Sequence, residues 1–345
     1  MSDPKRSEAM DAFLHRAGWS GAARSTLAGD ASFRRYERVA HANGAAVLMD
    51  APPPHEDVRP FLDVTARLTV CDVSVPKILA ADEAQGFLLI EDLGDALFTR
   101  VLRESPAREE ELYLAATEAL LAIARASRAN AGAWSRELKP YDTAVYLREA
   151  ALFAEWFLPQ VTGIDRARRL REEYLALWRD VLAAAQLKRD CLVHRDYHAD
   201  NLLWLDARNG HHAVGMLDYQ DALWGDAAYD LVSLLEDARR DVAPATVELC
   251  AGHFRKAGGE GDDFAARYAL LGAQRNAKII GIFTRLTVRD GKPHYLDYLP
   301  RVWGHFMHDL TLPLLAPVRQ FVDHHVPAAW RGRFVADAAI GGIAA

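Results

Sequence analysis

One eight-residue stretch, 194-HRDYHADN-201, concentrates side chains that can do chemistry: two aspartates, two histidines, an arginine and an asparagine. It lies between the apolar runs 191-CLV-193 and 202-LLWL-205, which have the composition of short strands. So many ionisable groups between two strands are typical of a metal site or of a catalytic loop that handles a proton and a phosphate. A surface loop can share this composition, so the choice between these interpretations depends on the neighbouring segments.

A predicted hairpin brings further ligand groups back to this loop. The segments 202–205 and 213–218 have strand character and flank 206-DARNGHH-212, whose Asn-Gly pair is a hairpin-turn signal. Because the two open ends of a hairpin lie side by side, Asn201 and Asp218 are expected to approach one point in space.

The chemistry of these oxygen ligands indicates phosphoryl transfer. The amide of Asn201 and the carboxylate of Asp218 suit a hard cation such as Mg²⁺, with nucleotide phosphates completing its coordination. Asp196, outside that coordination shell, is placed to accept the proton of an attacking hydroxyl group. Metal ligands and a positioned base are the main parts that phosphoryl transfer requires of a protein.

The histidines have other expected roles. His194 and His198 are four residues apart, but a shared zinc ion at that spacing needs a helix, and this loop lies between strands. His194 is expected to pin the loop through backbone hydrogen bonds, and His198 either to do the same or to lie near the phosphates. His211 and His212 fall on the hairpin turn, where a solvated pair is the ordinary explanation.

The bulk composition predicts a soluble, cytoplasmic enzyme. A length of 345 residues favours two domains or lobes, and 50% hydrophobic residues supply ample core material. The formal net charge of −7 gives no basic signature for nucleic acid. The N-terminus has no apolar signal region, and no apolar run approaches the roughly 18 residues of a membrane span. Three scattered cysteines without a CxxC pair argue against disulfides and zinc thiolates, and therefore favour a reducing compartment.

The periodicity along the chain predicts an α+β fold with two lobes. The small β-rich N-terminal lobe, 1–92, is expected to contain helices at 5–18 and 56–70 and strands at 24–29, 33–40, 45–50, 75–82 and 86–92. The larger helical lobe, 96–345, is expected to contain helices at 107–130, 141–158, 164–186, 226–250, 262–289 and 303–323, with the 202–218 hairpin as its only β element. The connector 91-EDLGD-95 is a hinge where a ligand crevice is expected.

The motifs 194-HRDYHADN-201, 216-MLDYQDA-222 and 225-GDAAYDLVSLL-235 resemble those of the aminoglycoside phosphotransferase-like kinases, whose hallmark is an HGDxHxxN loop. Within that family the chain is most similar to the bacterial amino-sugar kinases that phosphorylate N-acetylmuramate and N-acetylglucosamine at the anomeric hydroxyl. This narrower resemblance rests on 29-GDASFRRYERV-39, 48-LMDAPPP-54, 91-EDLGD-95 and 281-GIFTRLTVRDGKPHYLDYLPRV-302. The resemblance extends over essentially the whole chain.

The resemblance implies a bilobal, protein-kinase-like fold, ATP and Mg²⁺ as cofactors, and a sugar 1-phosphate as the product, in peptidoglycan recycling. It assigns Asp196 as the catalytic base and Asn201 and Asp218 as Mg²⁺ ligands. It also assigns Asp230 to hold the catalytic loop in position, with His194 and His198 as further residues that support this loop. A carboxylate at a helix N-terminus is in any case favoured by the helix dipole.

The resemblance also places the nucleotide. The ATP phosphates would be covered by the turn formed by Gly29, Asp30, Ala31, Ser32 and Phe33. The adenine would meet the hinge backbone at Glu91, Asp92 and Leu93.

Two departures from the family pattern matter. Arg195 stands where the antibiotic kinases usually have glycine, which gives the loop a protein-kinase-like HRD sequence. The chain nevertheless has no DFG and no APE segment, so a protein substrate is disfavoured. The third strand, 46-AVLMD-50, lacks the phosphate-binding lysine and has Met49 near its place.

A replacement for that lysine is expected nearby. Arg34 and Arg35 lie on opposite faces of the second strand, so one of them is predicted to point at the phosphates and supply the missing charge. Lys77 is an alternative. A catalytically silent, nucleotide-binding regulator is the remaining alternative, against which the intact base and metal ligands argue.

The acceptor is predicted from charge. Between residues 275 and 301, six basic side chains face only two acidic ones, which suits a neutral or carboxylate-bearing sugar better than a polycationic aminoglycoside. Part of this charge would belong to a solvated helix face. The candidate substrate contacts are Tyr219, Gln220, Asp221, Trp224, Arg275 and Arg289, of which the first four have packing between helices as their alternative. An aminoglycoside or another small alcohol remains the alternative acceptor.

Overall fold

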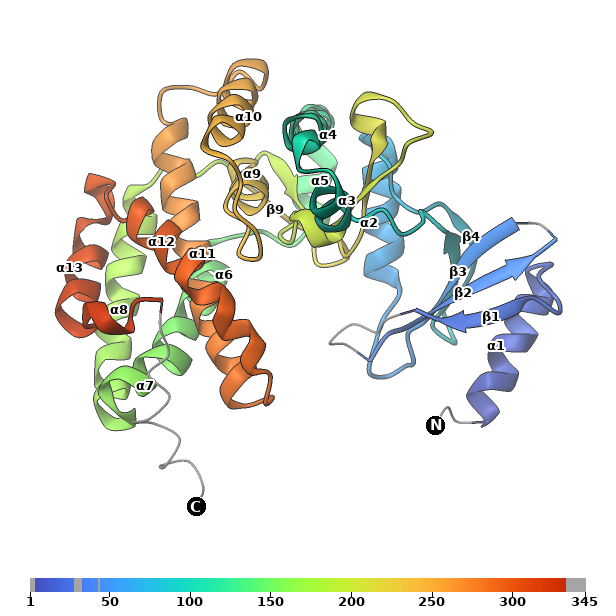
Figure 1. Cartoon of the computed structure of the whole chain (residues 1–345), viewed down its shortest axis with the longest axis horizontal. Coiled ribbons are helices and arrows are strands. Elements are labelled where there is room, and N and C mark those ends of the chain that lie inside the picture. The colour runs from blue at the N-terminus through green and yellow to red at the C-terminus, as the bar shows by residue number, and fades with distance from the viewer. Residues whose placement is uncertain (1–3, 28–32, 43, 333–345) are drawn as a thin grey trace. The chain divides into compact units, whose positions relative to one another are not determined.

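The computed structural model describes residues 4–27, 33–42 and 44–332, and the chain divides into two compact units (Figure 1). The first unit contains residues 1–108 and 199–222, and the second contains residues 109–198 and 223–345. The predicted N-terminal lobe, 1–92, therefore falls within the first unit, which also includes the segment that carries the predicted hairpin.

The first unit is built on a five-stranded antiparallel sheet with the strand order β1-β2-β3-β5-β4. Its strands are β1 (Ala23–Thr26), β2 (Arg35–His41), β3 (Gly44–Asp50), β4 (Ile78–Asp82) and β5 (Phe87–Glu91). The central strands β3 and β5 are the apolar runs GAAVLMD and FLLIE, which are buried over most of their length. The edge strand β4 alternates between half-buried and exposed residues, as expected for a strand with one solvated face. The predicted N-terminal sheet is confirmed.

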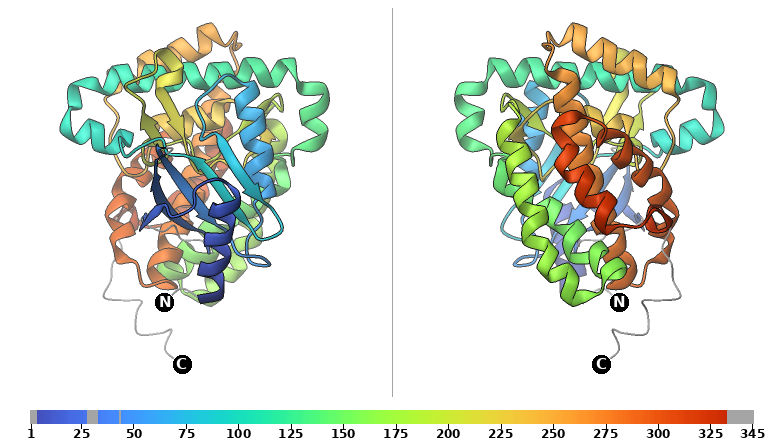
Figure 2. Two further views of the ribbon diagram at one scale, coloured as in Figure 1. Left: turned by 90° about the vertical axis from the view of Figure 1, so that its right-hand side faces the viewer. Right: turned by 90° about the vertical axis from the view of Figure 1, so that its left-hand side faces the viewer.

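Helix α1 (Pro4–Arg16) covers one face of this sheet (Figure 2). Its residues Met10, Phe13 and Leu14 recur at helical spacing and are buried against the sheet. Phe13 stacks on Phe87 of β5, with 5.6 Å between the ring centroids. The opposite face of β2, β3 and β5 is thereby left to line the cavity described below.

The predicted hairpin is confirmed and joins the first unit. Strand β7 (Leu202–Trp204) pairs antiparallel with β8 (Val214–Met216), and the connecting loop contains a 3-10 helix, η4 (Gly210–Ala213). Isolated bridges tie Leu203 to Leu97 and Gly215 to Ser74. The unit is completed by α2 (Arg59–Val70), α3 (Phe98–Glu104) and the 3-10 helices η1 (Pro106–Arg108) and η3 (Ala199–Asn201).

The second unit is mostly helical. Its helices are α4 (Glu109–Ala129), α5 (Ala131–Glu137), α6 (Thr143–Leu152), α7 (Leu158–Thr162), α8 (Ile164–Ala184), α9 (Ala228–Leu235), α10 (Pro244–Ala257), α11 (Phe264–Val288), α12 (Leu299–Asp309) and α13 (Ala316–His325). Helix α11 is central, because it packs on α6, α9 and α12. At Gly281 a Cβ atom would lie 2.3 Å from the backbone carbon of Leu152, so only glycine permits this close approach.

Three predicted helices are wrong in their continuity. The segment 141–158 changes from α6 to a π-helical turn, η2 (Phe153–Phe157), where the backbone passes Gly281. The segment 226–250 is broken between Leu235, where α9 ends, and Pro244, the first residue of α10, a position that proline favours. The segment 303–323 is likewise broken between α12 and α13 near Pro313.

The prediction of a single β element beyond residue 96 is also wrong. Strand β6 (Cys191–Val193) pairs antiparallel with β9 (Leu223–Gly225) in a second short ladder. Strand β6 is the apolar run 191-CLV-193, which has strand composition, but the three residues of β9 carry too little periodicity to be recognised alone, and the pairing depends on a partner far along the chain. Within the described ranges, none of the helices combines the length and apolar character that crossing a bilayer demands.

Candidate active site

The open end of the β7–β8 hairpin holds the two predicted metal ligands side by side. The N–H of Leu217 donates to the carbonyl oxygen of Asn201 at 2.9 Å, which extends the ladder beyond β7 and β8. Asp218 follows directly, with a left-handed backbone (φ 61°) that is uncommon for a residue other than glycine. Gln220 Nε2 donates to Asp218 Oδ1 at 2.7 Å. Strained backbone of this kind clusters at functional sites.

Asn201 and Asp218 lie on the wall of a cavity of about 450 Å³ within the first unit. This volume is in the range of small-molecule and cofactor pockets, roughly 300–1,000 Å³. Apolar side chains from β2, β3 and β5 and the backbone segment that follows β5 complete the wall, which is lined by Leu27, Tyr36, Arg38, Val47, Phe61, Pro76, Ile90, Glu91, Asp92, Leu93, Gly94, Asp95, Asp200, Asn201, Leu203, Leu217 and Asp218. The predicted hinge residues Glu91, Asp92 and Leu93 are among them.

Arg38 is the cationic side chain of this wall. Its Nε donates to Asp92 Oδ2 at 2.6 Å, and its Nη2 donates to Asp95 Oδ1 at 2.9 Å. These hydrogen bonds to Asp95 and Asp92 raise the pKa of Arg38, and Arg38 in turn lowers the pKa of Asp95. Strand alternation places Arg38 on the same face as Tyr36, so the pattern could have indicated it once the register of β2 was known.

The other predicted phosphate contacts that the structure describes do not line the cavity. Residues 29–32 are outside the described residues. Phe33 is 66% exposed, and Arg34 pairs with Glu56 at 3.0 Å. Arg35 and Lys77 are exposed, and none of these four side chains lines the cavity.

In the second unit, Asp230 holds the loop that follows β6. From the first turn of α9, its two carboxylate oxygens accept hydrogen bonds from the N–H groups of His194 (2.6 Å) and Arg195 (2.8 Å). The residue is 2% exposed, and burial raises its pKa to about 7. Arg195 has a left-handed backbone (φ 79°), so this brace maintains a strained turn directly before Asp196.

A buried ionic cluster lies beside the loop. Glu149 of α6 accepts hydrogen bonds from Arg195 Nη2 (2.6 Å) and Lys278 Nζ (3.0 Å) through one oxygen, and from the Tyr141 hydroxyl (2.6 Å) through the other. Lys278 also lies 3.4 Å from the hydroxyl of Tyr229. In the sequence Lys278 is distinguishable only as part of a basic segment, because its partner Glu149 comes from another helix.

This cluster sets the charge of Asp196. Burial acts to raise the pKa of the Asp196 carboxyl, but the nearby cations, led by Lys278, together bring that pKa below its usual value. Asp196 is therefore ionised at neutral pH. A half-buried carboxylate held in its charged form can accept a proton, as general-base chemistry requires.

The two loop histidines are buried. The ring of His194 packs edge-on against Tyr197, with 5.5 Å between the centroids. Burial and the neighbouring Arg239 lower the pKa of His198 to about 4, so its imidazole is neutral at pH 7. These surroundings fit a supporting role for both side chains.

The six candidate substrate residues have varied surroundings. Tyr219 is buried, stacks on Phe61 and lies 2.8 Å from the Thr65 hydroxyl, which fits the packing alternative. Trp224 is buried within β9, Gln220 contacts Asp218, and Asp221 is exposed.

The basic segment is partly neutralised. Arg275 is buried near the Glu236 carbonyl, at 3.4 Å. Arg289 is exposed and pairs with Asp290, while Arg301 pairs with Asp241. Asp241 and the Glu149 partner of Lys278 lie outside 275–301, so these two pairs make the excess of positive charge smaller than the sequence count, whereas Asp290 was already included in it.

Residues 24–269, more than half of the chain, match the model of the phosphotransferase enzyme family. The chain belongs to this family and is a phosphotransferase. It is 36% identical to an N-acetylmuramate/N-acetylglucosamine kinase of Caulobacter vibrioides over 95% of this chain and 98% of that protein. It is 37% identical to the N-acetylmuramate/N-acetylglucosamine kinase of Pseudomonas aeruginosa, over 87% of this chain and 91% of that protein.

Solved structures support the same fold. ADP-bound aminoglycoside phosphotransferase APH(2'')-Ib is similar with a TM-score of 0.56 and 12% sequence identity, over 88% of this chain and 97% of that one. The predicted aminoglycoside phosphotransferase-like fold is confirmed.

Proposed function

We propose that the protein is an ATP- and Mg²⁺-dependent kinase that phosphorylates the anomeric hydroxyl of N-acetylmuramate, N-acetylglucosamine or both, and that it serves peptidoglycan recycling. The observation that carries this proposal is the 36–37% identity, over nearly the whole chain, to kinases of these two sugars. An amino-sugar acceptor also agrees with the motifs that distinguish this chain within its family.

The residues of the first unit fit the nucleotide and the metal. Leu27, Val47 and Ile90 give the cavity an apolar wall suited to a base, and residues 91–95 add backbone groups. Asn201 and Asp218 offer only oxygen ligands, which Mg²⁺ prefers. Bound there, Mg²⁺ would neutralise the negative charge of the nucleotide phosphates.

In the proposed reaction Asp196 is the base. Its carboxylate accepts the proton of the sugar C1 hydroxyl while the hydroxyl oxygen attacks the γ-phosphorus, the bond from that phosphorus to the bridging oxygen of ADP breaks, and ADP leaves. Lys278 and Arg195 keep the carboxylate charged and ready to accept this proton. Asp230 and His194 act through the loop backbone, by positioning Asp196.

Asp196→Asn tests this assignment. We expect the variant to lose turnover, by at least 100-fold given the usual contribution of general-base catalysis, and to retain nearly native ATP affinity. Asp206→Asn, an exposed acid in the hairpin loop, is the matched control and is expected to be unchanged. Retention of most activity in Asp196→Asn would remove Asp196 from the mechanism.

A further inference from the structure

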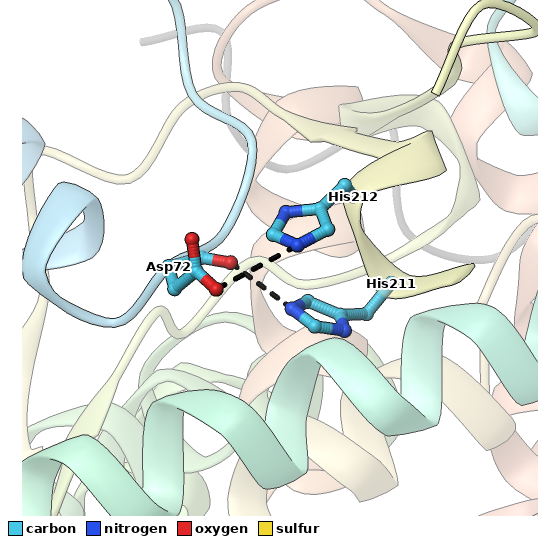
Figure 3. Close-up of side chains that lie close together, drawn as sticks. All are labelled: Asp72, His211 and His212. Carbon is cyan, nitrogen blue, oxygen red and sulfur yellow. Dashed lines mark hydrogen bonds and ion pairs between the residues drawn. The ribbon is translucent and has the colours of Figure 1, made fainter. Parts of the chain in front are cut away.

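Three metal-ligating side chains come together on the first unit, away from the open end of the hairpin. The carboxylate of Asp72 and one ring nitrogen from each of His211 and His212 all lie within 4.8 Å of one another. Figure 3 shows both imidazoles directed at Asp72 from the η4 segment. Across the residues that the structure describes, this is the only such group of three histidine, cysteine or acidic side chains.

The backbone holds these ligands in place across the long sequence separation. Ser74 Oγ donates to the carbonyl oxygen of His212 at 2.6 Å, and the N–H of Met216 donates to the carbonyl oxygen of Ser74 at 2.9 Å. His211 Nε2 lies 3.0 Å from the carbonyl oxygen of Asp72, and Asp72 has a left-handed backbone with φ 58°. These hydrogen bonds hold the loop after α2 next to the hairpin loop.

The side chains have room to close around an ion. His212 Nε2 lies 3.6 Å from Asp72 Oδ2, close to the spacing of about 3.3 Å between ligands of a tetrahedral ion that binds each at about 2 Å. The side chains of Asp72 and His212 are 83% and 43% exposed, so both can rotate. The ring centroids of His211 and His212 are 4.1 Å apart, so the two imidazoles lie next to each other.

From this geometry we infer that Asp72, His211 and His212 form a binding site for a zinc-type divalent cation, separate from the Mg²⁺ site. Two imidazoles and one carboxylate suit Zn²⁺ and its transition-metal neighbours, whereas Mg²⁺ prefers an all-oxygen set. The role is structural. The ion cross-links the loop after α2 to the far end of the hairpin whose open end carries Asn201 and Asp218.

Zinc titration of the untagged full-length chain tests the inference. The protein is stripped with EDTA and titrated with ZnCl₂ by calorimetry at pH 7.5 in excess Mg²⁺, which occupies oxygen-ligand sites. We expect one equivalent to bind to the native chain. That equivalent disappears in the double variant His211→Ala/His212→Ala, and Asp72→Asn weakens it at least about tenfold because the ligand loses its charge. Asparagine tolerates the left-handed backbone at residue 72, so this variant retains the fold.

The control is the other adjacent pair, His324 and His325 at the end of α13, whose rings are 4.5 Å apart but which belongs to no three-ligand group in the described part of the chain. His324→Ala/His325→Ala is expected to keep the full zinc equivalent. Equal zinc uptake by the native chain and the His211→Ala/His212→Ala variant would overturn the site. Loss of the equivalent in the His324→Ala/His325→Ala control would do the same.

Discussion

Replacing Asp230 by alanine tests how the loop before Asp196 is held. The substitution removes both acceptors of the His194 and Arg195 N–H groups, whose hydrogen bonds measure 2.6 and 2.8 Å. A hydrogen bond to a charged group contributes about 1.5–3 kcal/mol, so two of them amount to about 3–6 kcal/mol. Asp230→Asn keeps one acceptor oxygen and should cost about half as much. Released from its brace, the strained backbone of Arg195 relaxes, so turnover should fall in the same order.

The assay is the free energy of unfolding from urea titration, measured at pH 8, above the pKa of about 7 that burial gives Asp230. Asp165→Ala is the matched control, because Asp165 is an exposed acid in the first turn of α8. A helix-dipole contribution alone is worth about 0.3–1 kcal/mol at such a position. If Asp230→Ala costs no more than Asp165→Ala, Asp230 is only a favourable helix-end carboxylate and the brace is refuted.

Three further predictions concern charge in the two units. Lys278 lowers the pKa of Asp196, so Lys278→Met should move the acid limb of the pH profile of kcat/KM to higher pH, by about one pH unit or more. Lys278→Arg keeps the charge and should leave this limb in place. An unmoved limb in a folded Lys278→Met variant would contradict the prediction. Arg38→Ala removes the cationic partner of Asp92 and Asp95 on the cavity wall and should raise the KM for ATP about tenfold, equivalent to roughly 1.4 kcal/mol. Arg34→Ala should change this KM less, and the reverse order would restore Arg34 as the phosphate contact. Asp218→Asn should raise the Mg²⁺ concentration for half-maximal turnover at least about tenfold, since a charged ligand is lost, and an unchanged Mg²⁺ dependence would argue against the metal site.

The parts of the fold that follow from local pattern were predictable. The apolar strands β3 and β5 carry strong periodic signals, and the Asn-Gly pair marked the loop between β7 and β8, although Asn209 is extended and Gly210 begins the 3-10 helix η4 there. The geometry of a hairpin likewise places Asn201 beside Asp218 with no knowledge of the rest of the chain.

What depends on distant partners was not predictable. Strand β9 exists because residues 191–193 pair with it, and the π-turn at 153–157 occurs where Gly281 lets two backbones meet. Two prolines are local signals of helix boundaries: Pro244 begins α10, and Pro313 follows the end of α12. Arg38 depended on the register of β2, and Lys278 on a partner carboxylate in another helix.

The proposed acceptor is tested most directly by ADP release from Mg²⁺–ATP with N-acetylmuramate, N-acetylglucosamine and kanamycin in parallel, with phosphorus NMR of any product. We predict turnover with at least one of the two amino sugars, a product signal from a phosphate on the anomeric oxygen, and no turnover with kanamycin. Turnover with kanamycin alone, or ATP binding without transfer to any of the three, would contradict the proposed function.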